Sequence, residues 1–289
     1  MNTEATECVN LNGTDVSYNY CEGSGVPVLL VHGVGSSTQT WSELYGRLTQ
    51  AGRSVLAVDL FGHGQSGAGN GDYSLGANAT MLRDVLNVLR IEQVHLVGHS
   101  LGGGVSMQMF YQYPDRISSL TLIASGGLGT EVGASLRAAT LPGSEYVIRL
   151  ISRPEVTSTL QRAVGVLGVL GVRRHGFDDR LVQTLRDLQD ESKLSGFTNT
   201  LRSVIGIRGQ RVSALERLAQ INPETTLIIW GDSDPMLPSA HGYALHEMLP
   251  GSRIVIVANS GHDPHGDNPD LVFTELFAHI TRTEVTAAL

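Results

Sequence analysis

The feature that most constrains the fold is an alternation of short apolar runs with longer amphipathic segments. "VPVLLVHG" (26–33) is apolar up to its last two residues, as expected of a strand buried on both faces. Residues 36–52 follow with apolar side chains at helical spacing and a glycine at the end. Similar strand-like runs occur at 53–58, 94–99, 117–125, 225–231 and 252–257, with helical patterns at 74–93, 101–113, 239–249 and 271–282. This order predicts βαβ units and a mainly parallel sheet.

The alternation is preceded by a hairpin signal and interrupted once. Two β-rich runs flank Asn12-Gly13, a pair typical of two-residue hairpin turns. After Ser125, about 100 residues show helical periodicity and no convincing strand. We therefore predict one α/β core formed by residues 1–126 and 224–289, with residues 127–223 inserted as a helical cap, or lid.

Composition and charge exclude several classes of function. The chain of 289 residues has a net charge of -8, which argues against a nucleic-acid partner. The sequence contains no run of about 18 apolar residues, so no membrane span is predicted. Its acidic, polar start does not resemble a signal peptide. The two cysteines, Cys8 and Cys21, suggest neither a disulfide framework nor a metal cluster. The expected location is the cytoplasm.

Charge is unevenly distributed along the chain. Residues 128–217 contain 12 Arg and one Lys against nine Asp and Glu, a net +4, whereas the remainder is net -12. The hypothesis is that one or two cap arginines hold an anionic group of the substrate or steer an acyl carrier, because guanidinium groups pair with carboxylates and phosphates. The alternative is that they are solvated surface residues. The arginines concerned are Arg137, Arg149, Arg153, Arg162, Arg173, Arg174, Arg202, Arg208 and Arg211.

Ser100 lies in the pattern Gly98-x-Ser100-x-Gly102, between a predicted strand and a predicted helix. This is the context of a nucleophile elbow, a sharp turn that exposes a serine at the end of a strand. No other serine in the chain has this spacing. Because a hydroxyl needs a base to remove its proton, a histidine and an orienting carboxylate should follow.

Two later strand ends supply candidates for those partners. Asp232 and Asp234 follow one strand, and His262 and His265 follow the next. The carboxyl ends of parallel strands share one edge of the sheet, so all four can approach Ser100. Three further histidines, His32, His63 and His99, also lie at glycine-rich strand ends; we expect them to satisfy loop hydrogen bonds rather than to bind a metal.

Five motifs in this order resemble the α/β-hydrolase superfamily over nearly the full length of the chain. They are "HG" (32–33), "DLFGHGQS" (59–66), "GHSLGG" (98–103), "WGDSDPMLP" (230–238) and "SGH" (260–262). The resemblance implies a mostly parallel eight-stranded sheet flanked by helices. It also implies Ser100 as nucleophile, Asp234 as acid, His262 as base, and the N–H groups of Val34 and Leu101 as the oxyanion hole.

The expected activity is hydrolysis of a small-molecule carboxylic ester, thioester or lactone through an acyl-enzyme, without metal or organic cofactor. One alternative is the related branch that hydrolyses carbon–carbon bonds, whose members resemble "GNSMGG" at the elbow and carry an aromatic residue after the base. Here His99 and Asp263 stand at those positions. Another alternative is a small-molecule receptor or biosynthetic protein with the same fold. The sequence leaves the oligomeric state open, a homodimer among the options.

Overall fold

The computed structural model describes residues 6–169 and 179–287. Eight strands form one sheet in the order β1-β2-β4-β3-β5-β6-β9-β10. All neighbouring pairs are parallel except β1 with β2 and β2 with β4. The strands are β1 (Glu7–Leu11), β2 (Thr14–Cys21), β3 (Ser24–Val31), β4 (Arg53–Val58), β5 (Val94–His99), β6 (Ile117–Ile123), β9 (Thr226–Gly231) and β10 (Arg253–Val257). This is the mostly parallel eight-stranded sheet that the sequence analysis predicts.

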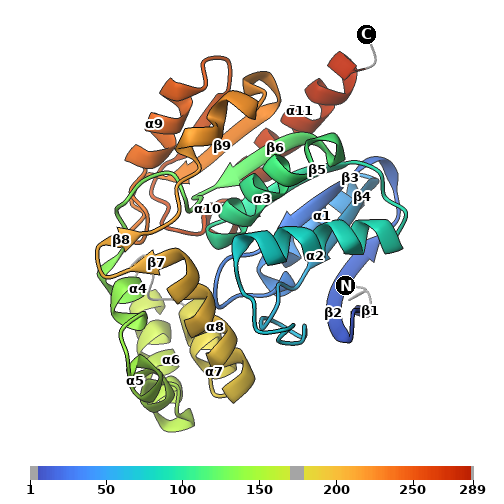
Figure 1. Ribbon diagram of the computed structural model, residues 1–289. Helices are drawn as coiled ribbons and strands as arrows, with labels where there is room; N and C mark the ends of the chain where they lie inside the picture. The colour runs from blue at the N-terminus through green and yellow to red at the C-terminus, as the bar shows by residue number, and fades with distance from the viewer. Residues whose placement is uncertain (1–5, 170–178, 288–289) are drawn as a thin grey trace.

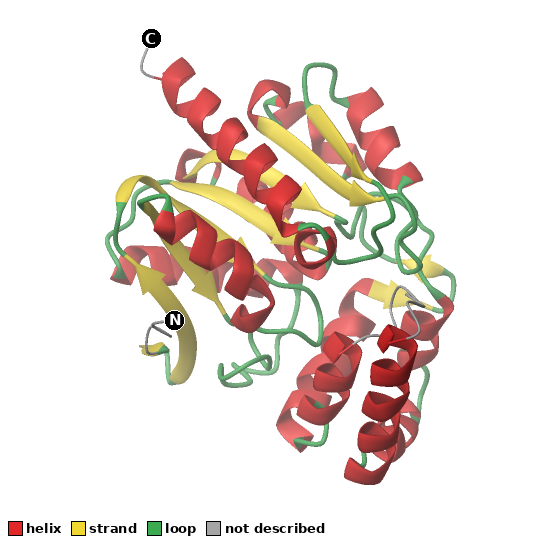
Figure 2. Ribbon diagram, turned by 180° about the vertical axis from the view of Figure 1, so that it is seen from behind, coloured by secondary structure: helices red, strands yellow, loops and turns green. Residues whose placement is uncertain are grey.

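Helices cover both faces of this sheet (Figures 1 and 2). One apolar cluster unites α1 (Ser42–Gln50) with α11 (Pro269–Ala287), and the other unites α2 (Leu75–Val88), α3 (Leu101–Gln112) and α9 (Ala240–Met248). A one-turn helix, α10 (Pro264–Asp267), precedes α11. Every residue of β4, β5 and β9 is buried, as expected of strands covered on both faces, and apolar residues predominate, although Arg53 and His95 are buried there too.

The hairpin signal at Asn12-Gly13 is confirmed. Asn12 and Gly13 join β1 to β2 with φ angles of 52° and 88°. Two successive positive φ angles define the turn that suits the twist of a two-residue hairpin, and asparagine and glycine adopt them most easily. Cys8 and Cys21, both among the described residues, are not joined by a disulfide bond.

Five α-helices of the described residues lie between β6 and β9 and gather at one end of the sheet (Figure 1). They are α4 (Ala134–Ala139), α5 (Ser144–Ile151), α6 (Pro154–Val169), α7 (Asp179–Asp187) and α8 (Glu191–Val204). The expectation that this region holds no strand was wrong in one detail, because β7 (Ile205–Gly206) and β8 (Gly209–Gln210) form a small antiparallel pair. Two-residue strands are too short to produce an alternating pattern. The boundaries of a separate cap stay a prediction.

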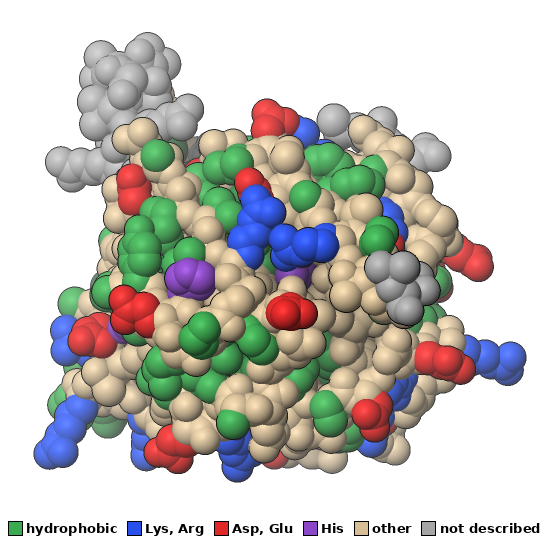
Figure 3. Space-filling model, turned by 90° about the horizontal axis from the view of Figure 1, so that it is seen from above, with side chains coloured by type: hydrophobic (Ala, Val, Ile, Leu, Met, Phe, Trp, Pro, Cys, Tyr) green, Lys and Arg blue, Asp and Glu red, His purple; other side chains and the backbone are tan. Residues whose placement is uncertain are grey.

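No helix in the described part of the chain is both long enough and apolar enough to cross a bilayer. On the face seen in Figure 3, acidic side chains lie among basic and apolar ones. That face therefore offers no continuous basic surface, among the described residues, to a polyanion.

Candidate active site

Ser100 occupies a strained turn between β5 and α3. Its φ and ψ are 53° and -116°, a backbone conformation that residues other than glycine rarely adopt. Its backbone N–H donates to the carbonyl of Ile123 on the neighbouring strand, and its own carbonyl accepts from Gly126. These bonds anchor the turn to the adjacent β6 end, so the hydroxyl is held at the carboxyl edge of the sheet.

The flanking glycines are required because the turn is crowded. A Cβ on Gly98 would lie 2.4 Å from the carbonyl oxygen of Gly102, and one on Gly102 would lie 2.1 Å from that of Val31. Both distances are too short for real atoms, and the obstacles are rigid backbone. The sequence pattern around Ser100 thus has a steric origin in the approach of β3 and α3.

Gly102→Ala is therefore expected to destabilise the protein by about 2 kcal/mol or more, because the added methyl group must displace the end of β3. The matched control is Gly104→Ala in the same helix, where a Cβ would meet the Leu75 side chain at 3.5 Å and the Gly126 carbonyl oxygen at 3.9 Å, both ordinary contacts. Alanine favours a helix, so this control should be neutral or stabilising. Urea unfolding measures both changes. Equal destabilisation by the two substitutions would contradict the steric explanation.

His262 and Asp234 reach Ser100 in a continuous chain of hydrogen bonds. The Nε2 atom of His262 lies 2.9 Å from the Ser100 Oγ, and its Nδ1 lies 2.8 Å from Asp234 Oδ2. The other carboxylate oxygen of Asp234 accepts from the N–H groups of Met236 and Leu237, at 2.8 and 3.0 Å. The Asp234 side chain is fully buried. The acid is thus held from both sides, and it orients the imidazole toward the hydroxyl.

The other two candidates lie elsewhere. The exposed Asp232 follows the end of β9, where its carboxylate accepts from the Ser233 hydroxyl. The ring of His265 packs 4.5 Å from that of Trp41, and its Nε2 lies 3.3 Å from Thr40 Oγ1. Of the four strand-end candidates, His262 and Asp234 are the pair that the structure brings to Ser100.

The pKa of His262 is set by opposing effects. Burial lowers it, but the hydrogen bond and charge of Asp234, together with the charge of Asp263, more than offset this and raise the pKa above 6.5. The positive charge of Arg180 lowers the pKa of His262. A base with a raised pKa holds a proton from a serine hydroxyl more firmly, and it needs a higher pH to become neutral again.

Activity is accordingly expected to fall as the pH drops through the raised pKa of His262, because only the neutral imidazole can accept the proton. Asp263→Asn removes a charge that stabilises the protonated ring, so the acidic limb of kcat/KM against pH should move to lower pH. Asp270→Asn removes the same charge at an exposed position on α11 and should leave the limb in place. A shift to higher pH in Asp263→Asn would contradict this electrostatic assignment.

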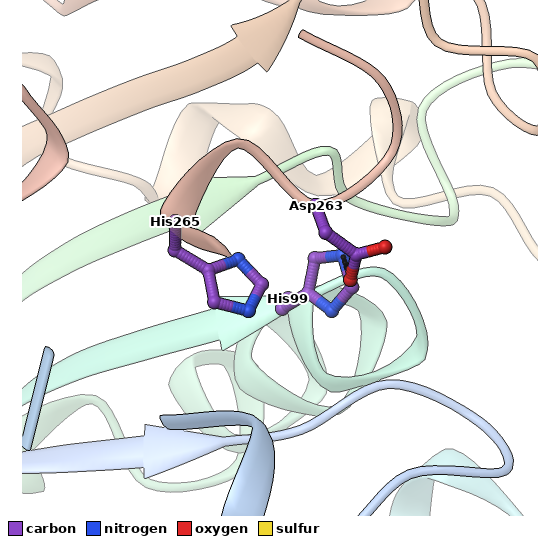
Figure 4. A group of neighbouring side chains, drawn as sticks. All are labelled: His99, Asp263 and His265. Carbon is purple, nitrogen blue, oxygen red and sulfur yellow. Dashed lines mark ion pairs between the residues drawn. The ribbon is translucent and has the colours of Figure 1, made fainter. Parts of the chain in front are cut away.

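Figure 4 shows a second group of titratable side chains, His99, Asp263 and His265. It lies beside the candidate triad of Ser100, His262 and Asp234, because the His99 ring is 5.0 Å from that of His262. Burial lowers the pKa of His99 to about 4 and that of His265 well below its ordinary value, so both rings are neutral. Although burial opposes ionisation of Asp263, the neighbouring histidines and Arg180 favour it, and its pKa falls to about 2.

The residue types of this group suit a metal, and one ligand atom from each lies within 4.8 Å of the others. However, the His99 Nε2, which lies 3.7 Å from Asp263, donates a hydrogen bond to the backbone carbonyl of His262 at 2.8 Å. A protonated Nε2 has no free lone pair for a cation, so only the buried Nδ1 of His99 keeps one. We therefore interpret His99 as a residue that fixes the loop carrying His262.

The other two histidines considered from the sequence also bind loop backbone, as expected. The Nδ1 of His32 donates to the Gly33 carbonyl, and its Nε2 accepts from the Leu60 N–H. The His63 Nδ1 bonds to the carbonyl of Phe61. Each ring joins glycine-rich turns near the carboxyl edge of the sheet.

Val34 and Leu101 both line a pocket that opens beside Ser100. Leu101 is the first residue of α3, so its N–H has no acceptor within the helix. Val34 follows the end of β3 and faces the same space. Both residues border the same space as Ser100, and the role of their N–H groups as an oxyanion hole stays a prediction.

The pocket has about 490 Å³ of space not filled by atoms, part of it open to solvent, and it is lined almost entirely by aliphatic side chains and glycine. Among the described lining residues, only Ser100 and Gln210 carry polar side chains. The aliphatic ones are Val34, Leu75, Leu101, Val132, Leu136, Leu201, Val204, Ile205, Val212 and Leu237. Helices α4 and α8 of the inserted segment thus form one wall, and the core forms the other.

No arginine of the described residues lines this pocket, so an arginine that binds substrate there stays a prediction without support from the lining. Arg173 and Arg174 lie outside the described residues. Arg149 and Arg202 instead form ion pairs with Glu191 and Glu145.

Sequence reasoning missed two residues that the structure places near the site. Gln210, on β8, accepts a hydrogen bond from the Gly127 N–H at 2.6 Å and fixes the pocket wall. Arg180, on α7, lies 2.7 Å from Asp267, whose other oxygen accepts from Ser260 and Gly261 just before His262. Neither residue belongs to a motif, so no local signal distinguished them.

The fold and site geometry define a protein of the hydrolase class built on an α/β sheet. A family model for the alpha/beta hydrolase fold matches residues 26–269, and the chain belongs to this family. It is 40% identical to an uncharacterized protein of Mycobacterium tuberculosis over 249 residues, 86% of this chain and 73% of that protein.

A characterised relative and a solved structure extend this comparison. The chain is 28% identical to the 2-hydroxy-6-oxononadienedioate/2-hydroxy-6-oxononatrienedioate hydrolase of Comamonas testosteroni, over 86% of this chain and 85% of the relative. It resembles the structure of an esterase from Rhodococcus sp. with a TM-score of 0.69 and 22% identity, over 96% of this chain and 98% of that one. The structural likeness shows the fold alone.

Proposed function

We propose that this protein is a serine hydrolase that cleaves a carboxylic ester, thioester or lactone with an uncharged, apolar acyl group. The observation that carries the proposal is the hydrogen-bonded chain from Asp234 through His262 to Ser100, which ends beside an aliphatic pocket. An activated hydroxyl next to such a pocket is suited to acyl transfer.

In the proposed first step, Ser100 Oγ attacks the acyl carbonyl while His262 Nε2 takes the hydroxyl proton. Asp234 holds the ring and stabilises its protonated form. The carbonyl oxygen becomes an oxyanion, which the N–H groups of Val34 and Leu101 bind. Such donors typically contribute a few kcal/mol each to the transition state.

Collapse of the tetrahedral intermediate breaks the bond to the alcohol, thiol or lactone oxygen. His262 returns the proton to this leaving group, and the acyl group remains on Ser100. Water, deprotonated by His262, then attacks the acyl-enzyme through a second oxyanion. The carboxylic acid is released and the Ser100 hydroxyl is restored, so no cofactor enters the reaction.

The pocket lining supports an uncharged substrate. The Comamonas relative is named for a dioate, a substrate with two carboxylates. A carboxylate placed among aliphatic side chains without a cation loses its hydration with little compensation. The described lining offers no cation, and Asp263 stands where the carbon–carbon hydrolases carry an aromatic residue. These features favour ester-type hydrolysis over cleavage of such a dioate.

The test compares the p-nitrophenyl ester of hexanoic acid with that of a dicarboxylic acid of similar length, whose acyl chain ends in a free carboxylate. We expect kcat/KM for the neutral ester to exceed that for the charged one by about 100-fold, equivalent to about 2.7 kcal/mol of desolvation cost in the transition state. Equal rates, or a preference for the charged ester at low salt, would contradict the proposal that the pocket binds an uncharged acyl group. Either result would favour an arginine contact with the substrate.

A further inference from the structure

One helix of the inserted segment exposes an unusual share of the large apolar side chains. Of the ten that the described residues leave exposed, five fall between positions 141 and 151. Four of them, Tyr146, Val147, Leu150 and Ile151, lie on α5, and Leu141 lies in the turn before it. We call these five residues the α5 face.

The α5 face is a continuous surface rather than a scatter of side chains. At 100° per residue, Tyr146, Leu150, Val147 and Ile151 fall within one arc of about 140°. Tyr146 is 80% exposed and Leu150 is 52% exposed. Ser144 and Ile148 are the buried residues of α5. Exposed apolar patches on soluble folds mark interaction sites more often than single exposed residues do.

Charge indicates the kind of partner. Residues 134–153 contain three arginines, Arg137, Arg149 and Arg153, and one acidic residue, Glu145. The three arginines are exposed, whereas Glu145 pairs with Arg202 on α8. The exposed ion pair of Arg149 with Glu191 is of a kind that contributes little. The α5 face is therefore apolar, and arginines are in excess at its margin, where the exposed Glu191 pairs with Arg149 and the exposed Glu155 lies two residues after Arg153.

We propose that the α5 face docks on an anionic lipid surface. Apolar side chains inserted at the headgroup boundary and arginines beside the headgroups are the two contributions that hold helices at such interfaces. The acidic core would be repelled by the same surface, so the molecule would approach with the inserted helices first. Figures 1 and 2 show α5 at the outer end of these helices, away from the sheet.

A second copy of the chain fits this face less well. Pairing about a two-fold axis would place the α5 face against itself and bring the Arg149 and Arg153 side chains of the two copies together. Like charges in close contact oppose association. An acidic carrier protein would match the arginines, but it would leave the exposed apolar side chains without an equivalent partner.

The position of the face also connects it to the pocket. Helix α4, which packs on α5, contributes Leu136 to the pocket lining. Docking at α5 would bring this wall close to the lipid surface, from which an acyl lipid could reach Ser100. This link to the substrate rests on the proposed function, whereas the docking does not.

Binding is tested with Ser100→Ala protein, so that the result does not depend on hydrolysis. The fraction of protein that sediments with phosphatidylcholine vesicles is compared with the fraction that sediments with vesicles containing about 30% anionic phospholipid. We expect stronger binding to the anionic vesicles, and a decrease of several-fold between about 0.05 M and 0.5 M salt. Tyr146→Ser/Leu150→Ser should weaken binding about tenfold or more, and Arg149→Gln/Arg153→Gln should abolish the preference for anionic lipid.

The matched control is Tyr243→Ser/Met248→Ser on α9, which removes two large apolar side chains that are 49% and 50% exposed on the core. It should bind vesicles as the parent protein does. The proposal is overturned if the parent protein does not bind anionic vesicles, or if the control pair weakens binding as much as the α5 pair. It is also overturned if the only effect of Tyr146→Ser/Leu150→Ser is to convert a dimer to a monomer, or to abolish binding to an acidic carrier protein. Thermal unfolding of each variant checks that the fold is retained.

Discussion

Ser100→Ala is expected to lower kcat for ester hydrolysis by about 10⁴-fold or more while the fold is retained. The hydroxyl is the acceptor of the acyl group, and no other serine in the chain lies in an elbow pattern. The hydroxyl also donates its hydrogen bond to His262 Nε2, and the Nδ1 of the same ring bonds to Asp234. Alanine removes this group without filling new space, so stability should change little.

Steady-state kinetics with a short p-nitrophenyl ester measures the loss. A fluorophosphonate should label the parent protein once, on Ser100, as shown by mass spectrometry of peptides. Labelling at another residue, or full activity in the variant, would refute the assignment. A parent protein that binds acyl compounds but does not hydrolyse them would instead support the receptor alternative.

Asp234→Asn and His262→Ala are each expected to lower kcat by about 10³-fold or more, because either change leaves Ser100 without an oriented base. Asparagine at position 234 preserves the shape of the side chain but lacks the charge that stabilises the protonated ring. The effect should therefore appear mainly in kcat rather than in KM.

Asp232→Asn and His265→Ala are the matched controls for these two substitutions. Both residues lie within three positions of their counterparts, yet their side chains bond to Ser233 and approach Thr40 rather than Ser100. Comparison of kcat for the four variants, each checked for folding, decides the assignment. It fails if either control is the more damaging member of its pair.

Much of the fold followed from local patterns. The fully buried strands β4, β5 and β9 are rich in apolar residues, and these short runs are visible in the sequence. Asn12-Gly13 specified a hairpin, and the glycines around Ser100 specified a crowded turn. By contrast, β7 and β8 are too short to show an alternating pattern of apolar residues, and their pairing depends on the helices around them.

The sequence by itself determined the fold class, the elbow serine and the two strand ends where its partners had to lie, because each depends on the spacing of neighbouring residues. Only the tertiary structure decided the rest. Two residues in one loop can point in different directions, and the packing of His265 against Trp41 directs that ring away, while Asp234 receives two backbone N–H groups that hold it toward His262. The aliphatic character of the pocket likewise arises from residues between positions 34 and 237, which become neighbours only when the sheet and the inserted helices pack together.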